Sequence, residues 1–60
     1  MPIIQVKLVE GRENEKVERF IKELAKVAHE TLDAPYQSIR VMVNEVPASR
    51  FAVGEKLKSE

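Results

Sequence analysis

Pro2, directly after the initiator Met1, becomes chemically active if Met1 is removed. Cleavage leaves a secondary amine, which acts as a base or nucleophile once its proton is lost, and apolar surroundings or nearby cations lower the pKa of such an amine. Arg12 and Arg40 are suited to carboxylates, because a guanidinium binds a carboxylate in bidentate fashion and keeps its charge at any working pH. Phe51 would add an apolar wall. Together these residue types indicate proton transfer on a carboxylate-bearing substrate.

Taken singly, each of these residues also has a structural interpretation. Many proteins begin Met-Pro and use the proline for no chemistry. Arg12 fits a solvated loop, Arg40 fits an edge-strand charge that discourages aggregation, and Phe51 fits an anchor at an interface between subunits. The chemical hypothesis therefore depends on the combination and on the elements that position it.

The composition limits the classes of protein and site. Sixty residues make one domain, 1–60, too short to be comfortably stable alone. Cysteine is absent and His29 is the single histidine, which excludes a disulfide and a structural zinc site.

Ten basic and ten acidic side chains are interspersed, so we expect neither nucleic acid nor a membrane as partner. No charged leader or long apolar run is present, which favours the cytoplasm.

The hydrophobic pattern predicts a strand, a helix and a second strand. Residues 3–9 are rich in branched apolar side chains with polar interruptions, as in a strand. Apolar residues then recur at helical spacing from Asn14, a good N-cap, until the segment 33–35, where Pro35 stops the helix. Residues 39–46 alternate again as a strand. The result is an α+β fold, a single βαβ unit with parallel strands and a right-handed crossover.

The remaining residues predict a short C-terminal hairpin or loop over 47–54 and a frayed tail over 56–60. The helix covers one face of the sheet, whereas the other face, which carries Met42 and Val46, has no second helix to cover it. We therefore expect an obligate oligomer with closed symmetry. His29 lies at the margin of the apolar arc of the helix, so we expect a rim residue rather than a catalyst.

The βαβ geometry separates the chemical residues. Pro2 opens the first strand and Arg40 lies near the start of the parallel second strand, so both share one edge of the sheet. Arg12 lies beyond the opposite end, roughly ten residues and about 33 Å of extended chain from Pro2. Within one subunit the two are not expected to meet. A neighbouring subunit would have to supply its Arg12.

Four segments in order resemble the 4-oxalocrotonate tautomerase family over essentially the whole chain. They are the run Leu8-Val9-Glu10-Gly11-Arg12, the helix end Leu32-Asp33-Ala34-Pro35, the strand start Ser38-Ile39-Arg40-Val41, and Phe51 before Ala52-Val53-Gly54, all behind Pro2.

The resemblance implies a homo-oligomeric isomerase, a hexamer, that needs no metal or cofactor and serves aromatic hydrocarbon catabolism. Pro2, freed of Met1, would be the general base that converts a 2-hydroxymuconate-type dienol into the conjugated 2-oxo-3-enedioate. Arg40 would hold the C1 carboxylate and 2-oxygen, and Arg12 the distal carboxylate, both from neighbouring subunits. Phe51 would help form the apolar pocket, and Ser38 belongs to the same substrate-binding set.

Two alternatives stay open. Hydratases and dehalogenases that resemble this chain use an additional carboxylate to activate water, but here no acid follows Phe51 until Glu55. A non-catalytic oligomeric binding module would keep the fold without turnover. Replacement of Pro2 separates these cases, because a binding module would be indifferent to it.

Overall fold

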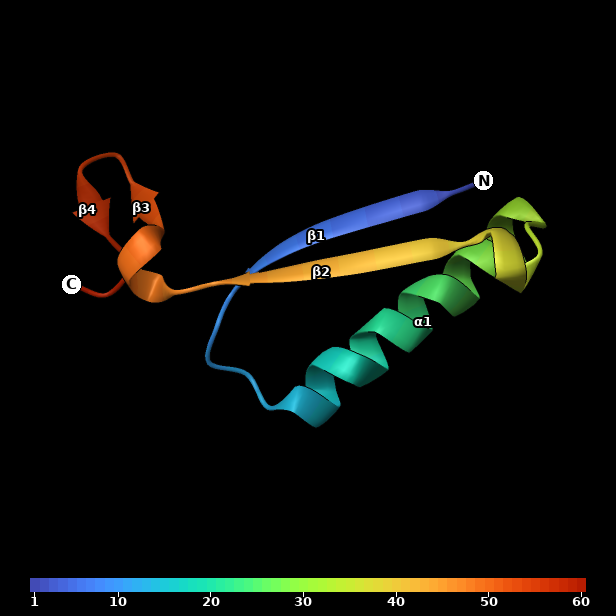
Figure 1. The fold of residues 1–60 in the computed structure, drawn as a ribbon, viewed down its shortest axis with the longest axis horizontal. Helices are drawn as coiled ribbons and strands as arrows, with labels where there is room; N and C mark the ends of the chain where they lie inside the picture. Colours follow the sequence, from blue (N-terminus) through green and yellow to red (C-terminus); the bar gives the residue numbers. More distant parts are fainter.

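The computed structural model describes all residues, 1–60, and shows a βαβ unit followed by a small hairpin (Figure 1). In chain order the elements are β1 (Ile3–Val9), α1 (Asn14–Leu32), the 3₁₀ turn η1 (Tyr36–Ser38), β2 (Arg40–Val46), the 3₁₀ turn η2 (Ala48–Arg50), β3 (Ala52–Val53) and β4 (Lys56–Leu57). Strands β1 and β2 are parallel, and β3 and β4 are antiparallel. The predicted α+β fold with one long helix and a C-terminal hairpin is confirmed.

The register of the parallel pair runs from Ile3 opposite Arg40 to Val9 opposite Val46. A further main-chain hydrogen bond extends the pairing at each end of the two strands. At the start, the Arg40 N–H donates to the Pro2 carbonyl (3.0 Å), and at the far end the Glu10 N–H donates to the Val46 carbonyl (2.9 Å). Side chains alternate between the two faces, and alternate residues are half-buried while the others are exposed along most of both strands. The half-buried residues Ile4, Val6, Leu8, Val41 and Val43 share the face toward α1, whereas Val9 and Val46 are half-buried at the far end of the opposite face.

Helix α1 is amphipathic, and its buried side chains are Val17 and Ala28. The predicted cap at Asn14 is wrong by one residue, since Glu13 is the N-cap and its carbonyl accepts the first helical bonds. Glu13 makes no side-chain cap bond, so main-chain geometry alone sets the start. The helix ends as predicted before Pro35, and Asp33 takes a left-handed conformation with φ 56°.

The C-terminal segment is more ordered than the sequence suggested. The expectation of a frayed tail over 56–60 is wrong for Lys56–Leu57, which form β4 opposite β3. Gly54, with φ 62°, takes the first position of the two-residue loop, where glycine is favoured. The Lys58 N–H donates to the Phe51 carbonyl at 2.7 Å, which extends the pairing by main-chain bonds that apolar periodicity does not reveal.

A lone chain is extended rather than compact. Its radius of gyration is 14.4 Å, against about 10.4 Å for a compact chain of this length. Its accessible surface is 5010 Å², against about 4,000 Å² expected for its mass. Only Val17, Ala28 and Ile39 are buried. Such a chain lacks a core large enough to be stable alone.

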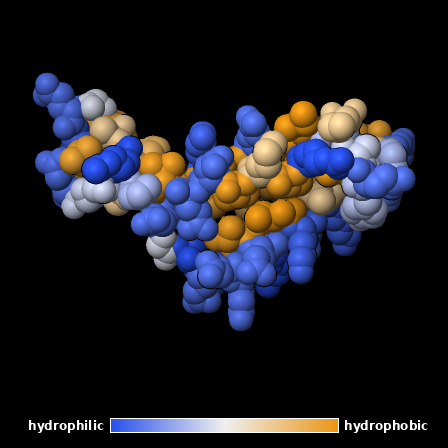
Figure 2. Space-filling view, viewed as in Figure 1, coloured by the Kyte–Doolittle hydropathy of each residue, from blue (hydrophilic) through white to orange (hydrophobic).

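Large apolar side chains are exposed on several elements, and Figure 2 shows hydrophobic residues gathered over the two long strands. The exposed large apolar residues are Met1, Ile3, Phe20, Val27, Leu32, Tyr36, Met42, Phe51, Val53 and Leu57. An apolar surface of this extent on so small a chain is typical of an interface. No helix of the chain is both long and apolar enough to cross a membrane.

We therefore predict that folding and assembly are one equilibrium. The midpoint of thermal unfolding should rise with protein concentration, because mass action favours a folded state that exists only as an assembly. Circular dichroism melts over a hundredfold range of concentration measure this dependence. A folded monomer at micromolar concentration in analytical ultracentrifugation would contradict it.

Candidate active site

Pro2 lies at the N-terminal edge of the parallel sheet and is half-buried. Its carbonyl accepts the Arg40 N–H at 3.0 Å, so the start of β2 fixes the position of Pro2. Met1 in front of it is 78 % exposed. A peptidase could therefore reach Met1, and its removal would leave the proline nitrogen at this edge as a free secondary amine.

Arg40, the first residue of β2, has an oriented guanidinium. Its Nη1 donates to the Gln37 carbonyl at 2.7 Å and approaches the Ile39 carbonyl at 3.3 Å. A guanidinium carries five N–H donors, so Nε and Nη2 remain available for a carboxylate. Neither hydrogen bond of Arg40 is to an acidic side chain. The cation is therefore held in place by main-chain oxygens and is not neutralised by a carboxylate partner.

Arg12 lies in the loop between β1 and α1 and shows the same arrangement. Its Nη1 donates to the carbonyl of Val9, three residues earlier, at 3.0 Å, as Arg40 does to Gln37. Gly11 between them has φ 130°, a conformation that side chains rarely adopt, and this turn directs the chain from β1 into the loop. Arg12 is exposed, and its remaining N–H groups are free to bind an anion.

Phe51 joins η2 to β3 and is 38 % exposed. Its N–H approaches the Ala48 carbonyl (3.4 Å), and its own carbonyl accepts the Lys58 N–H (2.7 Å). The ring is therefore presented by a short, hydrogen-bonded hairpin rather than by a loose tail. In Figure 1 this hairpin projects beyond the end of the sheet that is farthest from the N-terminus.

The predicted site residues form two groups at opposite ends of one chain. Pro2, Ser38 and Arg40 lie where the strands begin, and Arg12 and Phe51 lie beyond the ends of the strands (Figure 1). A strand of seven residues separates them by about 23 Å. One chain thus brings the main chain of Arg40 beside Pro2 and leaves Arg12 and Phe51 remote. The resemblance implied instead that Arg40, like Arg12, comes from a neighbouring subunit.

Ser38 is half-buried at the end of η1, and its hydroxyl donates to the Pro35 carbonyl at 2.9 Å. The donated proton is not available to a substrate carboxylate, although the oxygen can still accept a hydrogen bond. Its predicted part in substrate binding stays a prediction, and the observed bond gives it a part in shaping the turn before Arg40.

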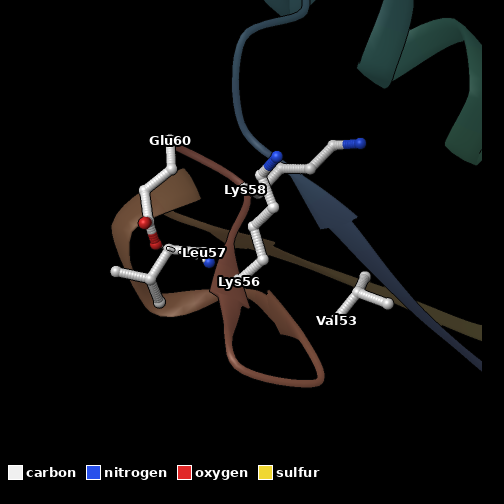
Figure 3. Close-up of a pocket in the computed structure, with 5 residues that line it drawn as sticks. All are labelled: Val53, Lys56, Leu57, Lys58 and Glu60. Carbon is white, nitrogen blue, oxygen red and sulfur yellow. Dashed lines mark hydrogen bonds between the residues drawn. The ribbon is translucent and has the colours of Figure 1, made fainter.

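The main hollow of the chain lies elsewhere, on the C-terminal hairpin (Figure 3). It is an open depression of about 330 Å³ lined by Val53, Lys56, Leu57, Lys58 and Glu60. The Glu60 carboxylate accepts the Leu57 N–H at 2.8 Å beside it. None of the predicted site residues lines it. No group of three or more histidine, cysteine or acidic side chains is placed to hold a metal ion.

Sequence reasoning missed a contact between the helix end and η1. His29 stacks on Tyr36 with ring centroids 3.9 Å apart and planes 18° apart. Its Nδ1 lies 2.7 Å from the Ala34 carbonyl. The sequence signal that could have indicated this contact is Tyr36, an aromatic residue directly after Pro35. It follows His29 by one helical turn and a short link. The expectation of a rim position for His29 agrees with its half-buried state.

The chain is similar in sequence to known proteins over nearly its whole length. Residues 2–60 match the family model described as "Tautomerase enzyme". A 2-hydroxymuconate tautomerase of Pseudomonas putida is 38% identical over 60 residues, which cover 100% of this chain and 95% of that protein.

Two solved structures share the fold over nearly the whole chain. TomN, a 4-oxalocrotonate tautomerase homologue in the tomaymycin biosynthetic pathway, superposes with a TM-score of 0.89 at 40% identity, covering 97% of this chain and 89% of its own. A heterohexameric 4-oxalocrotonate tautomerase from Chloroflexus aurantiacus superposes with a TM-score of 0.89 at 27% identity, covering 100% and 97%. The family match over residues 2–60 spans both groups of predicted site residues.

Proposed function

The chain belongs to the tautomerase family, and from this premise we propose that it is a keto–enol tautomerase whose general base is the amine of Pro2 after removal of Met1. The proposed reaction converts a 2-hydroxymuconate-type dienol into the conjugated 2-oxo-3-enedioate. The observation that carries the proposal is the main-chain hydrogen bond of the Arg40 N–H to the Pro2 carbonyl (3.0 Å), which places the residues of the proposed base and cation side by side at one sheet edge.

The proposed chemistry is a proton relay with no change in oxidation state. The Pro2 nitrogen takes the proton of the 2-hydroxyl, and the oxygen becomes a carbonyl as electrons shift through the diene. The protonated Pro2 then returns a proton to C5, which regenerates the neutral amine. A positioned base contributes roughly 10²- to 10⁴-fold to such a step. Arg40 would bind the C1 carboxylate and the 2-oxygen, where negative charge develops, and preorganised cations at that position add a further large factor.

A complete site would require more than one copy of the chain. Arg12 and Phe51 lie at the end of the sheet opposite to Pro2, so neighbouring subunits would have to bring them to it. We propose a homohexamer, because relatives of this fold include a hexameric assembly and because the lone chain exposes so much apolar surface. In that assembly Arg12 would bind the distal carboxylate, and Phe51 would exclude water from Pro2 and favour its neutral form.

The proposed part of Arg12 gives a prediction that depends on substrate. Arg12→Ala should raise KM for a dicarboxylate dienol by roughly 10- to 100-fold with little change in kcat, because it removes one charge-assisted bond made equally in the ground and transition states. A monocarboxylate dienol, which lacks the distal group, should be nearly unaffected. Steady-state kinetics on both substrates measure this difference.

Arg19→Ala is the matched control, since Arg19 is an exposed arginine on α1. It should leave KM unchanged for both substrates. Equal losses on the dicarboxylate and the monocarboxylate would remove Arg12 from the distal carboxylate site.

The proposed activity is tested by following ketonisation of 2-hydroxymuconate in the ultraviolet. The processed protein should accelerate the reaction well above its rate in buffer, and saturation with substrate should follow. Binding of the dienol without acceleration would instead favour the non-catalytic binding module.

A further inference from the structure

His29, the single histidine, ties the end of α1 to the turn η1. Its Nδ1 donates to the Ala34 carbonyl at 2.7 Å, and Nδ1 must carry the proton because a carbonyl oxygen only accepts. The imidazole stacks on Tyr36 with centroids 3.9 Å apart. His29 is half-buried and Tyr36 is exposed. We call these three residues, His29, Ala34 and Tyr36, the imidazole clamp.

The clamped turn is built from a few short-range bonds. The Ser38 N–H and hydroxyl donate to the Pro35 carbonyl at 3.0 and 2.9 Å. The Ile39 N–H donates to the Tyr36 carbonyl at 3.1 Å. A 3₁₀ turn of three residues has poor hydrogen-bond geometry and depends on its flanks. One flank is Ile39, which is buried, and the clamp fixes the other.

The same turn holds the Arg40 side chain. The Gln37 carbonyl, next to Tyr36, accepts the Arg40 Nη1 at 2.7 Å, the shorter of the two bonds of this guanidinium. A movement of Tyr36 therefore displaces the oxygen that orients the guanidinium. We propose that the imidazole clamp positions Arg40 for its substrate, which makes His29 and Tyr36 positioning residues. The inference rests on the proposed function, because it assigns them to the tautomerase site.

The imidazole clamp is suited to positioning Arg40 because no other side chain holds the link 33–35 to the helix. Asp33 and Pro35, which flank Ala34, are both exposed, and Asp33 sits in the left-handed region with φ 56°. Without the imidazole, the link and the first residue of η1 would keep only the short-range bonds from Ser38 and Ile39 to the Pro35 and Tyr36 carbonyls. The guanidinium would then sample several orientations, and substrate binding would have to select one of them.

A double-mutant cycle tests whether His29 acts through Arg40. His29→Ala should lower kcat/KM for the dienol by roughly 2- to 30-fold, the range of long-range coupling. In the Arg40→Ala background the same change should have no further effect. Tyr36→Phe keeps the ring and should retain activity, whereas Tyr36→Ala should match His29→Ala. Glu30→Ala, an exposed neighbour on α1, is the control and should change nothing.

Amide hydrogen exchange gives a second readout that does not depend on turnover. In His29→Ala the Ser38 and Ile39 amides should exchange faster, while the Glu10 amide, bonded to Val46 at the far end of the sheet, should keep its rate. Equal losses of kcat/KM in both Arg40 backgrounds, or unchanged exchange at Ser38 and Ile39, would overturn the proposal. If the wild-type protein does not ketonise the dienol, the proposed function fails, and exchange alone then decides whether the clamp holds the turn.

Discussion

Pro2→Ala should lower kcat/KM for 2-hydroxymuconate by roughly 10²- to 10⁴-fold, the contribution of a positioned general base. Replacement removes the cyclic secondary amine and the fixed φ that directs it. It leaves the carbonyl of residue 2 in place, and this carbonyl accepts the Arg40 N–H. The sheet edge and the assembly should therefore be retained while turnover is lost.

Sedimentation and intact mass of the variant accompany the kinetics. The mass shows whether Met1 has been removed from both proteins, and sedimentation shows whether the subunits still assemble. A processed, assembled Pro2→Ala protein with wild-type kcat/KM would show that the base is another group. If the wild type and the variant bind the dienol equally well and neither protein converts it, the non-catalytic binding module would be favoured.

Arg40→Ala should lower kcat and kcat/KM together, by roughly 10²- to 10³-fold, as loss of a preorganised donor to a developing oxyanion does. The guanidinium would act on charge that appears at the 2-oxygen only as the proton leaves, so the loss falls on the chemical step. Arg40→Lys should recover part of the rate, because it restores a cation without the planar donor pair. Steady-state and single-turnover kinetics separate this effect from slow product release.

The contrast with Arg12 makes this prediction specific. If Arg40→Ala raised KM alone, as expected of Arg12→Ala, Arg40 would bind the substrate without polarising it. The Arg40 backbone N–H survives replacement, so its bond to the Pro2 carbonyl should keep Pro2 in place and confine the change to the side chain.

The elements of this fold could be predicted because local pattern dictates them. Alternating apolar residues set β1 and β2, and the apolar arc together with Pro35 sets α1. The same pattern does not set the exact residues at which each element begins and ends. Asn14 has good capping chemistry but lies one residue inside the helix. The path of the preceding loop decides where the helix begins, and it outweighs the capping preference of one residue.

The C-terminal residues were harder to predict because main-chain bonds and not apolar periodicity order them. Lys56 and Leu57 pair with Val53 and Ala52 through main-chain bonds across a two-residue loop, while every side chain of 51–60 stays exposed. Such a hairpin is marginal alone. We expect its apolar residues, such as Val53 at 73 % exposure, to be buried by another subunit.

The residue types of the candidate site stay a prediction, and the structure bears only on where those residues lie. Sequence order showed that Arg12 and Pro2 lie at opposite ends of β1, and the structure agrees. Contacts between residues on different elements, such as the stack of His29 on Tyr36, depend on the path of the link at 33–35 and have no periodic signature. The bonds of both guanidiniums to carbonyls three residues earlier were likewise hidden, because they follow from turn geometry.

The central claim is that the Pro2 amine is the base, and the most direct measurement compares the same chain with and without Met1. With Met1 present the Pro2 nitrogen is an amide and has no basicity. Fractions separated and identified by intact mass should show 2-hydroxymuconate ketonisation in proportion to the chains that begin at Pro2, and none in the Met1-bearing fraction. Equal activity in both fractions, or an inactive fraction that begins at Pro2, would contradict the account.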